Sequence, residues 1–292
     1  MAEITQACVS ANGVEFSYLT VGDARAPLAL CLHGFPDSAH GWRYLLPALA
    51  EAGYRGVAPF QRGYAPTSVP PDGRYQTGAL AMDAIALHEA LGGDADAVII
   101  GHDWGASGTH GAAVFAPERW SKVVTMAVPP GPALGMAFVS NLAQVQRSWY
   151  MFFFQHALSD FVVAANDLAF IDMLWAQWSP GYDATDDLVY TKAGLRDPAN
   201  LAAALGYYRA TLGDGYRDPA LDAVQAAGQG WATQPHLYLQ GRNDGCIGAE
   251  VAEAAAAMAP PNVTVEFIGD AGHFLHIEQP AIVNARIIEF LG

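Results

Sequence analysis

One aspartate of the sequence lies in a pattern that suits a catalytic nucleophile. It is Asp103, the centre of residues 101–105, which read GHDWG between an apolar run at 95–100 and a segment of helical character at 106–115. Glycines two positions to either side allow the sharp, strained strand-to-helix turn on which such nucleophiles are exposed. The alternative is a glycine-rich turn whose aspartate only caps the helix, so other segments must decide between the two.

A carboxylate and a histidine follow Asp103 in the order nucleophile, acid, histidine that a triad on this kind of turn requires. Asp244 lies in residues 241–245, GRNDG, after an apolar run, and His273 follows the last such run. Taken singly, Asp244 suits a turn and His273 a surface position. Because side chains at the carboxyl ends of parallel strands converge on one edge of a sheet, we predict that the three residues form a triad.

A further segment could bind a developing negative charge. Residues 33–36, HGFP, follow the early apolar run at 27–32. Beside a nucleophile turn, an oxyanion is held by the backbone N–H of the residue after the nucleophile and by one from an early loop of this kind. We therefore expect the N–H groups of Trp104 and Phe35 to form an oxyanion hole; the alternative for 33–36 is a simple turn.

The elements that must position these residues alternate between strands and helices. The expected strands are 14–21, 27–32, 54–60, 95–100, 122–128, 235–240 and 263–268, and the expected helices of this region are 77–91, 106–115 and 280–291. This alternation predicts an α/β fold with a mostly parallel sheet covered on both faces. From about 131 to 230 aromatic residues and alanines recur at helical spacings instead. We therefore predict a core of residues 1–130 and 231–292 with a helical cap, 131–230, inserted between core strands.

Composition narrows the class of protein. The 292 residues are 52% apolar, which suffices for one large α/β domain, and the formal net charge is -15. Scattered basic residues in so acidic a chain argue against nucleic acid or anionic membranes as partners. No basic-apolar leader and no apolar run of roughly 18 residues is visible. The three cysteines lack CxxC spacing and fit reduced thiols, so we expect a soluble cytoplasmic protein.

Together these segments resemble the epoxide hydrolases of the α/β-hydrolase fold, over nearly the whole chain. The resemblance rests on HGFP at 33–36, RGY at 62–64, GHDWG at 101–105 and GHF at 272–274. It implies a helical cap from which two tyrosines point at the nucleophile. The cap segments that match are 148–153, SWYMFF, and 206–209, GYYR. They imply Tyr150 and Tyr208 as the pair, with the adjacent Tyr207 as the alternative to Tyr208.

An aspartate nucleophile also selects the substrate class. A serine that attacked an sp³ carbon would form an ether that no triad can hydrolyse, whereas an aspartate forms an ester that water can release. The target is therefore an epoxide or an alkyl halide. The resemblance implies that Asp103 opens an epoxide whose oxygen Tyr150 and Tyr208 hold, and that His273, oriented by Asp244, activates water to release a vicinal diol. Neither a metal nor an organic cofactor is needed.

Two other functions compete with this interpretation. Haloalkane dehalogenases share the fold, triad and nucleophile, and hold the leaving halide with N–H donors; Trp104 with Trp149 or Trp175 could supply them. Phe35, where many dehalogenases carry a polar residue, and the matched tyrosines favour an epoxide, and fluoroacetate dehalogenases typically have an arginine where this chain has Trp104. A non-catalytic ligand-binding protein of the same fold often lacks a triad member or an oxyanion-loop glycine, and here all are present.

Three histidines near the expected site, His33, His102 and His276, are assigned structural roles because no carboxylate–histidine spacing suggests zinc. The aromatic cap hints at apolar substrates, and an exposed part of the cap could support a homodimer.

Overall fold

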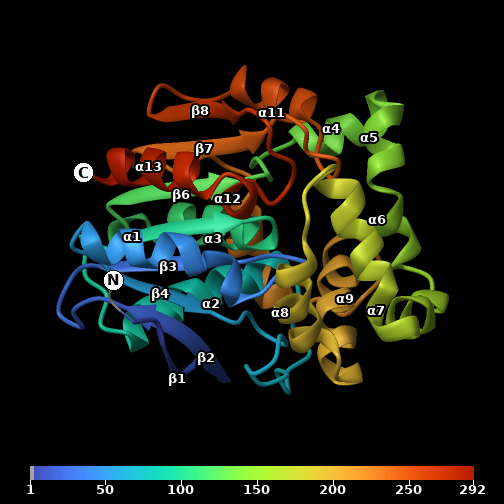
Figure 1. Cartoon of the computed structure of the whole chain (residues 1–292), viewed down its shortest axis with the longest axis horizontal. Coiled ribbons are helices and arrows are strands. Elements are labelled where there is room, and N and C mark those ends of the chain that lie inside the picture. Colours follow the sequence, from blue (N-terminus) through green and yellow to red (C-terminus); the bar gives the residue numbers. More distant parts are fainter. Residues whose placement is uncertain (1–2) are drawn as a thin grey trace.

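An eight-stranded sheet in the order β1-β2-β4-β3-β5-β6-β7-β8 forms the centre of the molecule. The computed structural model describes residues 3–292, and Figure 1 shows its layers. β1 (Thr5–Ala11) pairs antiparallel with β2 (Val14–Val21), which pairs antiparallel with β4 (Arg55–Pro59). The remaining strands run parallel to β4; they are β3 (Leu28–Leu32), β5 (Val98–His102), β6 (Lys122–Met126), β7 (His236–Gly241) and β8 (Val263–Ile268). The predicted mostly parallel sheet is confirmed.

The central strands are continuous apolar runs because helices cover both of their faces. Every residue of β3 and β5 is buried. The helices on the two faces are α1 (Leu45–Glu51) and α13 (Pro280–Leu291) on one, and α2 (Thr77–Ala90) and α3 (Trp104–Phe115) on the other. Along β3, Cys31 belongs to the first of these cores and Leu30 to the second, because successive side chains of a strand point to opposite faces.

A helical insertion between β6 and β7 forms the second layer of the molecule, as predicted. Its helices are α4 (Ala133–Ser140), α5 (Leu142–Arg147), α6 (Trp149–Phe153), α7 (Leu158–Trp178), α8 (Thr185–Leu195), α9 (Pro198–Leu212) and α10 (Asp222–Ala227). Figure 1 shows α4 to α9 gathered at one end of the sheet, at the side toward which β7 points. A kink at Ala165–Leu168 divides α7 into two helical segments. α10 lies against α2 and α3 of the core instead.

Short helices complete the architecture. They are the 3-10 helices Ala39–Tyr44, Pro117–Arg119 and Pro219–Leu221, and the α-helices α11 (Ala249–Ala256) and α12 (Leu275–Glu278). The edge strand β1 is absent from the sequence-based prediction, and β5 begins at Val98 rather than at 95 because residues 94–97 form a turn closed by the Ala97 N–H and the Asp94 carbonyl. Across residues 3–292, none of the helices has both the length and the apolar character required to cross a bilayer.

Candidate active site

The turn between β5 and α3 holds Asp103 in a strained conformation. Its φ of 53° and ψ of -119° lie in a region that residues other than glycine rarely occupy. A Cβ at Gly101 would collide with the carbonyl oxygen of Gly105, and one at Gly105 would collide with that of Leu32. Strand and helix can approach this closely only because both flanking residues are glycines. The structure thus places Asp103 on the sharp turn that the spacing predicts.

Asp103, Asp244 and His273 lie together at the carboxyl ends of β5, β7 and β8. His273 Nε2 is 3.6 Å from Asp103 Oδ2, and His273 Nδ1 is 3.0 Å from Asp244 Oδ2. All three residues are buried. The structure therefore brings the three side chains into the spatial order carboxylate, imidazole, carboxylate.

Backbone and side-chain donors fix Asp244. Its Oδ1 accepts the N–H groups of Cys246 at 2.7 Å and Ile247 at 2.9 Å, and its Oδ2 also accepts the Gln240 amide at 2.8 Å. With every lone-pair direction occupied, the carboxylate has little freedom to rotate. It can therefore hold His273 in one orientation, with the Nδ1 hydrogen toward Asp244 and Nε2 toward Asp103.

The two carboxylates determine the charge of the imidazole between them. Burial alone would lower the pKa of His273, but the negative charges of Asp244 and Asp103, together with the hydrogen bond to Asp244, raise the pKa to about 10. Burial alone would raise the pKa of Asp103, but His273 and the Phe35 N–H lower the pKa below its ordinary value. At neutral pH the free site therefore contains an Asp103 carboxylate beside a His273 imidazolium.

The loop after β3 supplies a donor to the Asp103 carboxylate. The Phe35 N–H donates to Asp103 Oδ1 at 2.8 Å. A Cβ at Gly34 would collide with the Asp103 side chain, so the glycine of HGFP allows this approach. Trp104 is the first residue of α3, and the first N–H groups of a helix have no acceptor within it. The N–H groups of Phe35 and Trp104 thus flank Asp103, and Oδ1 is the oxygen already held by one of them.

The three tyrosines of the two cap segments have different surroundings in the structure. The Tyr207 hydroxyl donates to the Arg62 carbonyl at 2.8 Å. The ring of Tyr208 lies edge-on to that of Trp104, with centroids 4.9 Å apart, and edge-on to that of Tyr150 at 5.6 Å. Of the three, Tyr208 lines the cavity that contains Asp103, whereas Tyr207 and Tyr150 do not. The Tyr150 hydroxyl lies 3.2 Å from Cys246 Sγ.

Several buried donors near Asp103 have no hydrogen-bond partner within residues 3–292, and two of them line its cavity beside it. Among residues 3–292, the Tyr208 hydroxyl and the Trp104 indole N–H are buried without a hydrogen-bond partner. Burial raises the pKa of Tyr208 well above its ordinary value, and the negative charge of Asp103 raises it further. Tyr208 therefore stays protonated, and its O–H can donate to a ligand oxygen.

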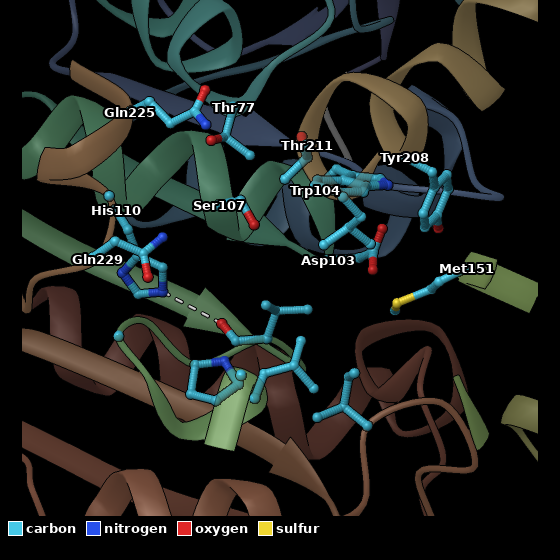
Figure 2. Close-up of a pocket in the computed structure, with 18 of the residues that line it drawn as sticks. Thr77, Asp103, Trp104, Ser107, His110, Met151, Tyr208, Thr211, Gln225 and Gln229 are labelled. Atoms are coloured by element: carbon cyan, nitrogen blue, oxygen red, sulfur yellow. Dashed lines mark hydrogen bonds between the residues drawn. The ribbon is translucent and has the colours of Figure 1, made fainter. Parts of the chain in front are cut away.

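A cavity of about 340 Å³ extends from Asp103 between the core and the cap. Figure 2 shows Asp103, Trp104, Tyr208 and Met151 around one end of it. Its other end is lined by polar residues that the sequence analysis did not single out; they are Thr77, Ser107, His110, Gln225 and Gln229. The sequence did contain a signal for Ser107 and His110, because their spacing from Asp103 places all three residues on one face of a helix.

The three histidines expected to be structural make hydrogen bonds to backbone groups or pack against one another. His33 bonds the Gln61 N–H and the Gly34 carbonyl, and His102 Nε2 donates to the His273 carbonyl at 2.8 Å. His276 packs on His102, with ring centroids 4.5 Å apart. His102, His276 and Asp37 each offer a possible metal-ligand atom within 4.8 Å of one another, a cluster that sequence spacing did not indicate.

Comparisons with known proteins agree with this architecture. A family model described as alpha/beta hydrolase fold matches residues 27–280. The AB hydrolase superfamily protein YfhM of Bacillus subtilis is 30% identical, covering 97% of this chain and 96% of the relative. Epoxide hydrolase A of Mycobacterium tuberculosis is 28% identical, covering 100% of this chain and 98% of the relative.

Solved structures show the same fold. A putative epoxide hydrolase from Klebsiella pneumoniae superposes with a TM-score of 0.84 at 24% identity, covering 99% of this chain and 97% of the other. A Bacillus megaterium epoxide hydrolase in complex with an inhibitor superposes with a TM-score of 0.81 at 24% identity, covering 98% and 99%. At these identities the two structures support the fold alone.

Proposed function

The chain belongs to the α/β-hydrolase fold family, and within it we propose that the protein is an epoxide hydrolase that converts epoxides to vicinal diols. The observation that carries the proposal is an aspartate, in place of a serine, on the nucleophile turn, with the free Tyr208 hydroxyl in the same cavity. Relatives that cover nearly the whole chain, among them the Mycobacterium tuberculosis protein, bear the name epoxide hydrolase, which supports the same substrate class.

In the first step, Asp103 forms an ester with a ring carbon. Because Oδ1 accepts the Phe35 N–H, we assign the attack to Oδ2. The ring C–O bond breaks as the new ester bond forms, and the ring oxygen takes a proton from Tyr208, with Tyr150 as the second donor. Solvent then returns a proton to the tyrosine. The tyrosines lower the barrier because they bind the ring oxygen more strongly as its negative charge develops.

In the second step, water releases the ester. Formation of the ester neutralises Asp103 and so removes one of the two negative charges that raise the pKa of His273. His273 can then lose its proton and act as a general base, oriented by Asp244. It takes a proton from water, whose oxygen attacks the carbonyl carbon of Asp103. The oxyanion forms on Oδ1, held by the Phe35 and Trp104 N–H groups, each commonly worth about 3 kcal/mol. Collapse breaks the ester bond, releases the diol and restores the carboxylate.

The haloalkane dehalogenase alternative is less well supported by the geometry. A halide site needs a second N–H donor beside Trp104. The Trp175 indole donates to the Pro36 carbonyl at 2.8 Å, and Trp149 is 37% exposed and packs on Phe153. Neither of the two partners considered from the sequence is therefore free at Asp103, whereas the Tyr208 hydroxyl is. The Trp178 indole N–H, in a ring 5.1 Å from that of His273, is also buried without a partner within residues 3–292, so the epoxide assignment rests on Tyr208 and on the named relatives.

The exposed apolar side chains of the cap bear on the oligomeric state. We propose that a second copy of the chain binds on the cap, where Val139 and Leu142 are 88% and 85% exposed; sedimentation velocity would test this. We also propose a cytoplasmic location, because the three cysteines are sparse and lack CxxC spacing.

The experiment that tests the function is diol formation from styrene oxide by the purified protein, with Asp103→Ala as the control. Diol made by the wild type and not by the variant supports the proposal. If neither this epoxide nor a linear one such as 1,2-epoxyoctane yields diol, while bromoalkanes release halide, the dehalogenase alternative replaces it.

A further inference from the structure

The cavity has two chemically different ends, and its far end is polar without being charged. Within residues 3–292, its lining contains no Lys, Arg or Glu, and Asp103 is its one carboxylate. The wall opposite α3 is apolar and includes Val128, Leu134 and Phe138. Ser107 and His110 line the α3 wall, and Figure 2 shows the Ser107 side chain directed into the space between Asp103 and His110.

His110, which lines this end, carries a hydrogen-bond acceptor without a partner in the described part of the chain. It is 1% exposed, and its Nε2 lies 3.3 Å from the Val128 carbonyl oxygen. Since a carbonyl only accepts, Nε2 must carry the hydrogen and Nδ1 must carry the lone pair. Burial lowers the pKa of His110 to about 4, so the ring is neutral at physiological pH. Among the described residues, Nδ1 is buried with no partner.

Hydrogen-bond donors line the same end of the cavity. The Gln225 amide oxygen accepts the Gln76 amide at 3.2 Å, while Gln76 is itself fixed to the backbone of Asp218. This leaves the Gln225 amide hydrogens for a ligand, and the Ser107 hydroxyl can donate or accept. A group that both accepts from a donor and donates to His110 would satisfy the whole set. A hydroxyl does both.

We propose that this end of the cavity is a specificity subsite for a neutral hydroxyl group carried by the epoxide substrate, remote from the ring. The inference rests on the proposed epoxide hydrolase function. A rise of 1.5 Å per residue puts Ser107 and His110 roughly 6 and 10 Å beyond Asp103 along α3. The hydroxyl therefore lies roughly that far from the carbon that Asp103 attacks. An anionic substituent would find no cation here, and an alkyl chain would leave His110 Nδ1 unsatisfied.

Two epoxides of the same length distinguish recognition of a hydroxyl group at this subsite from simple apolar binding. They are 1,2-epoxyoctane and 6,7-epoxyheptan-1-ol, in which a hydroxyl replaces the terminal methyl group. The readout is kcat/KM for each, and the ratio of the hydroxyl to the methyl compound, in the wild type, Ser107→Ala and His110→Phe. Ser140→Ala, an exposed serine on α4, is the matched control.

We expect the wild type to prefer the hydroxyl compound. The ratio should fall roughly five-fold in Ser107→Ala and in His110→Phe, about one net hydrogen bond each, and stay unchanged in Ser140→Ala. Alanine has a higher helix propensity than serine, so we expect Ser107→Ala to fold. The comparison of the two epoxides can then be made with Ser107→Ala even if His110→Phe fails to fold. A wild-type preference for 1,2-epoxyoctane, or a ratio that neither substitution changes, overturns the subsite alone. Absence of diol from both compounds overturns the proposed function and the subsite together.

Discussion

Replacing single tyrosine hydroxyls of the cap should identify the group that opens the ring. Tyr208→Phe removes a hydroxyl that shares the cavity with Asp103 and has no partner within residues 3–292. Its loss should slow ester formation by about 10²- to 10³-fold, which is the cost of removing one preorganised donor from a developing oxyanion. Tyr150→Phe should have a smaller effect, because the Tyr150 hydroxyl already lies 3.2 Å from Cys246 Sγ.

Tyr207→Phe is the matched control, since it makes the same chemical change one residue away. The Tyr207 hydroxyl is bonded to the Arg62 carbonyl, so its loss should cost about 1–3 kcal/mol of stability and leave ester formation unchanged. The assay is a single-turnover measurement in the His273→Gln background, where the ester accumulates and intact mass gives its rate of formation. Slowing by Tyr207→Phe, with a normal rate in Tyr208→Phe, would refute the assignment.

Two further predictions concern the pH profile and the nucleophile turn. The rate of ester formation should be constant across neutral pH and fall only in acid, because His273 lowers the pKa of Asp103. The rate of ester hydrolysis should instead rise with pH, because this step needs neutral His273. The pKa of His273 is about 10 in the free site and falls once Asp103 is neutral. Single-turnover rates of the two phases from pH 5 to 10 test this, and parallel profiles would argue against it. Gly105→Ala should destabilise the protein by about 3 kcal/mol, because its Cβ would meet the Leu32 carbonyl. Gly135→Ala, with open space around its Cβ, should be neutral or slightly stabilising in urea unfolding, and equal effects of the two would contradict the packing argument.

The parts of the fold that sequence could predict are those with a strong local signal. Buried parallel strands are continuous apolar runs, so the strands from β3 to β8 were predicted to within a few residues. Strand β1 was missed because Thr5–Ala11 is a partly exposed edge strand of mixed polarity. The grouping of Asp103, Asp244 and His273 could be expected because the carboxyl ends of parallel strands meet.

Other features of the site depend on how elements pack, which spacing alone does not give. Tyr207 and Tyr208 differ by about 100° around α9, and only the packing of α9 decides which faces Asp103. The polar end of the cavity depends on α10 folding back onto α2 and α3, so that Gln225, from a distant segment, lines the same cavity as His110. The hydrogen bonds from Gln240 and Ile247 to Asp244 likewise depend on the path of the loop after β7.

The most direct test of the account is the mass of the His273→Gln protein after incubation with an epoxide that the wild type hydrolyses. The account predicts one adduct, heavier than the free protein by the mass of the epoxide, on the peptide that contains Asp103, and its absence in the Asp103→Ala, His273→Gln double variant. A His273→Gln protein that forms diol at the wild-type rate, or that is inactive and carries no adduct although folded, would contradict the two-step mechanism.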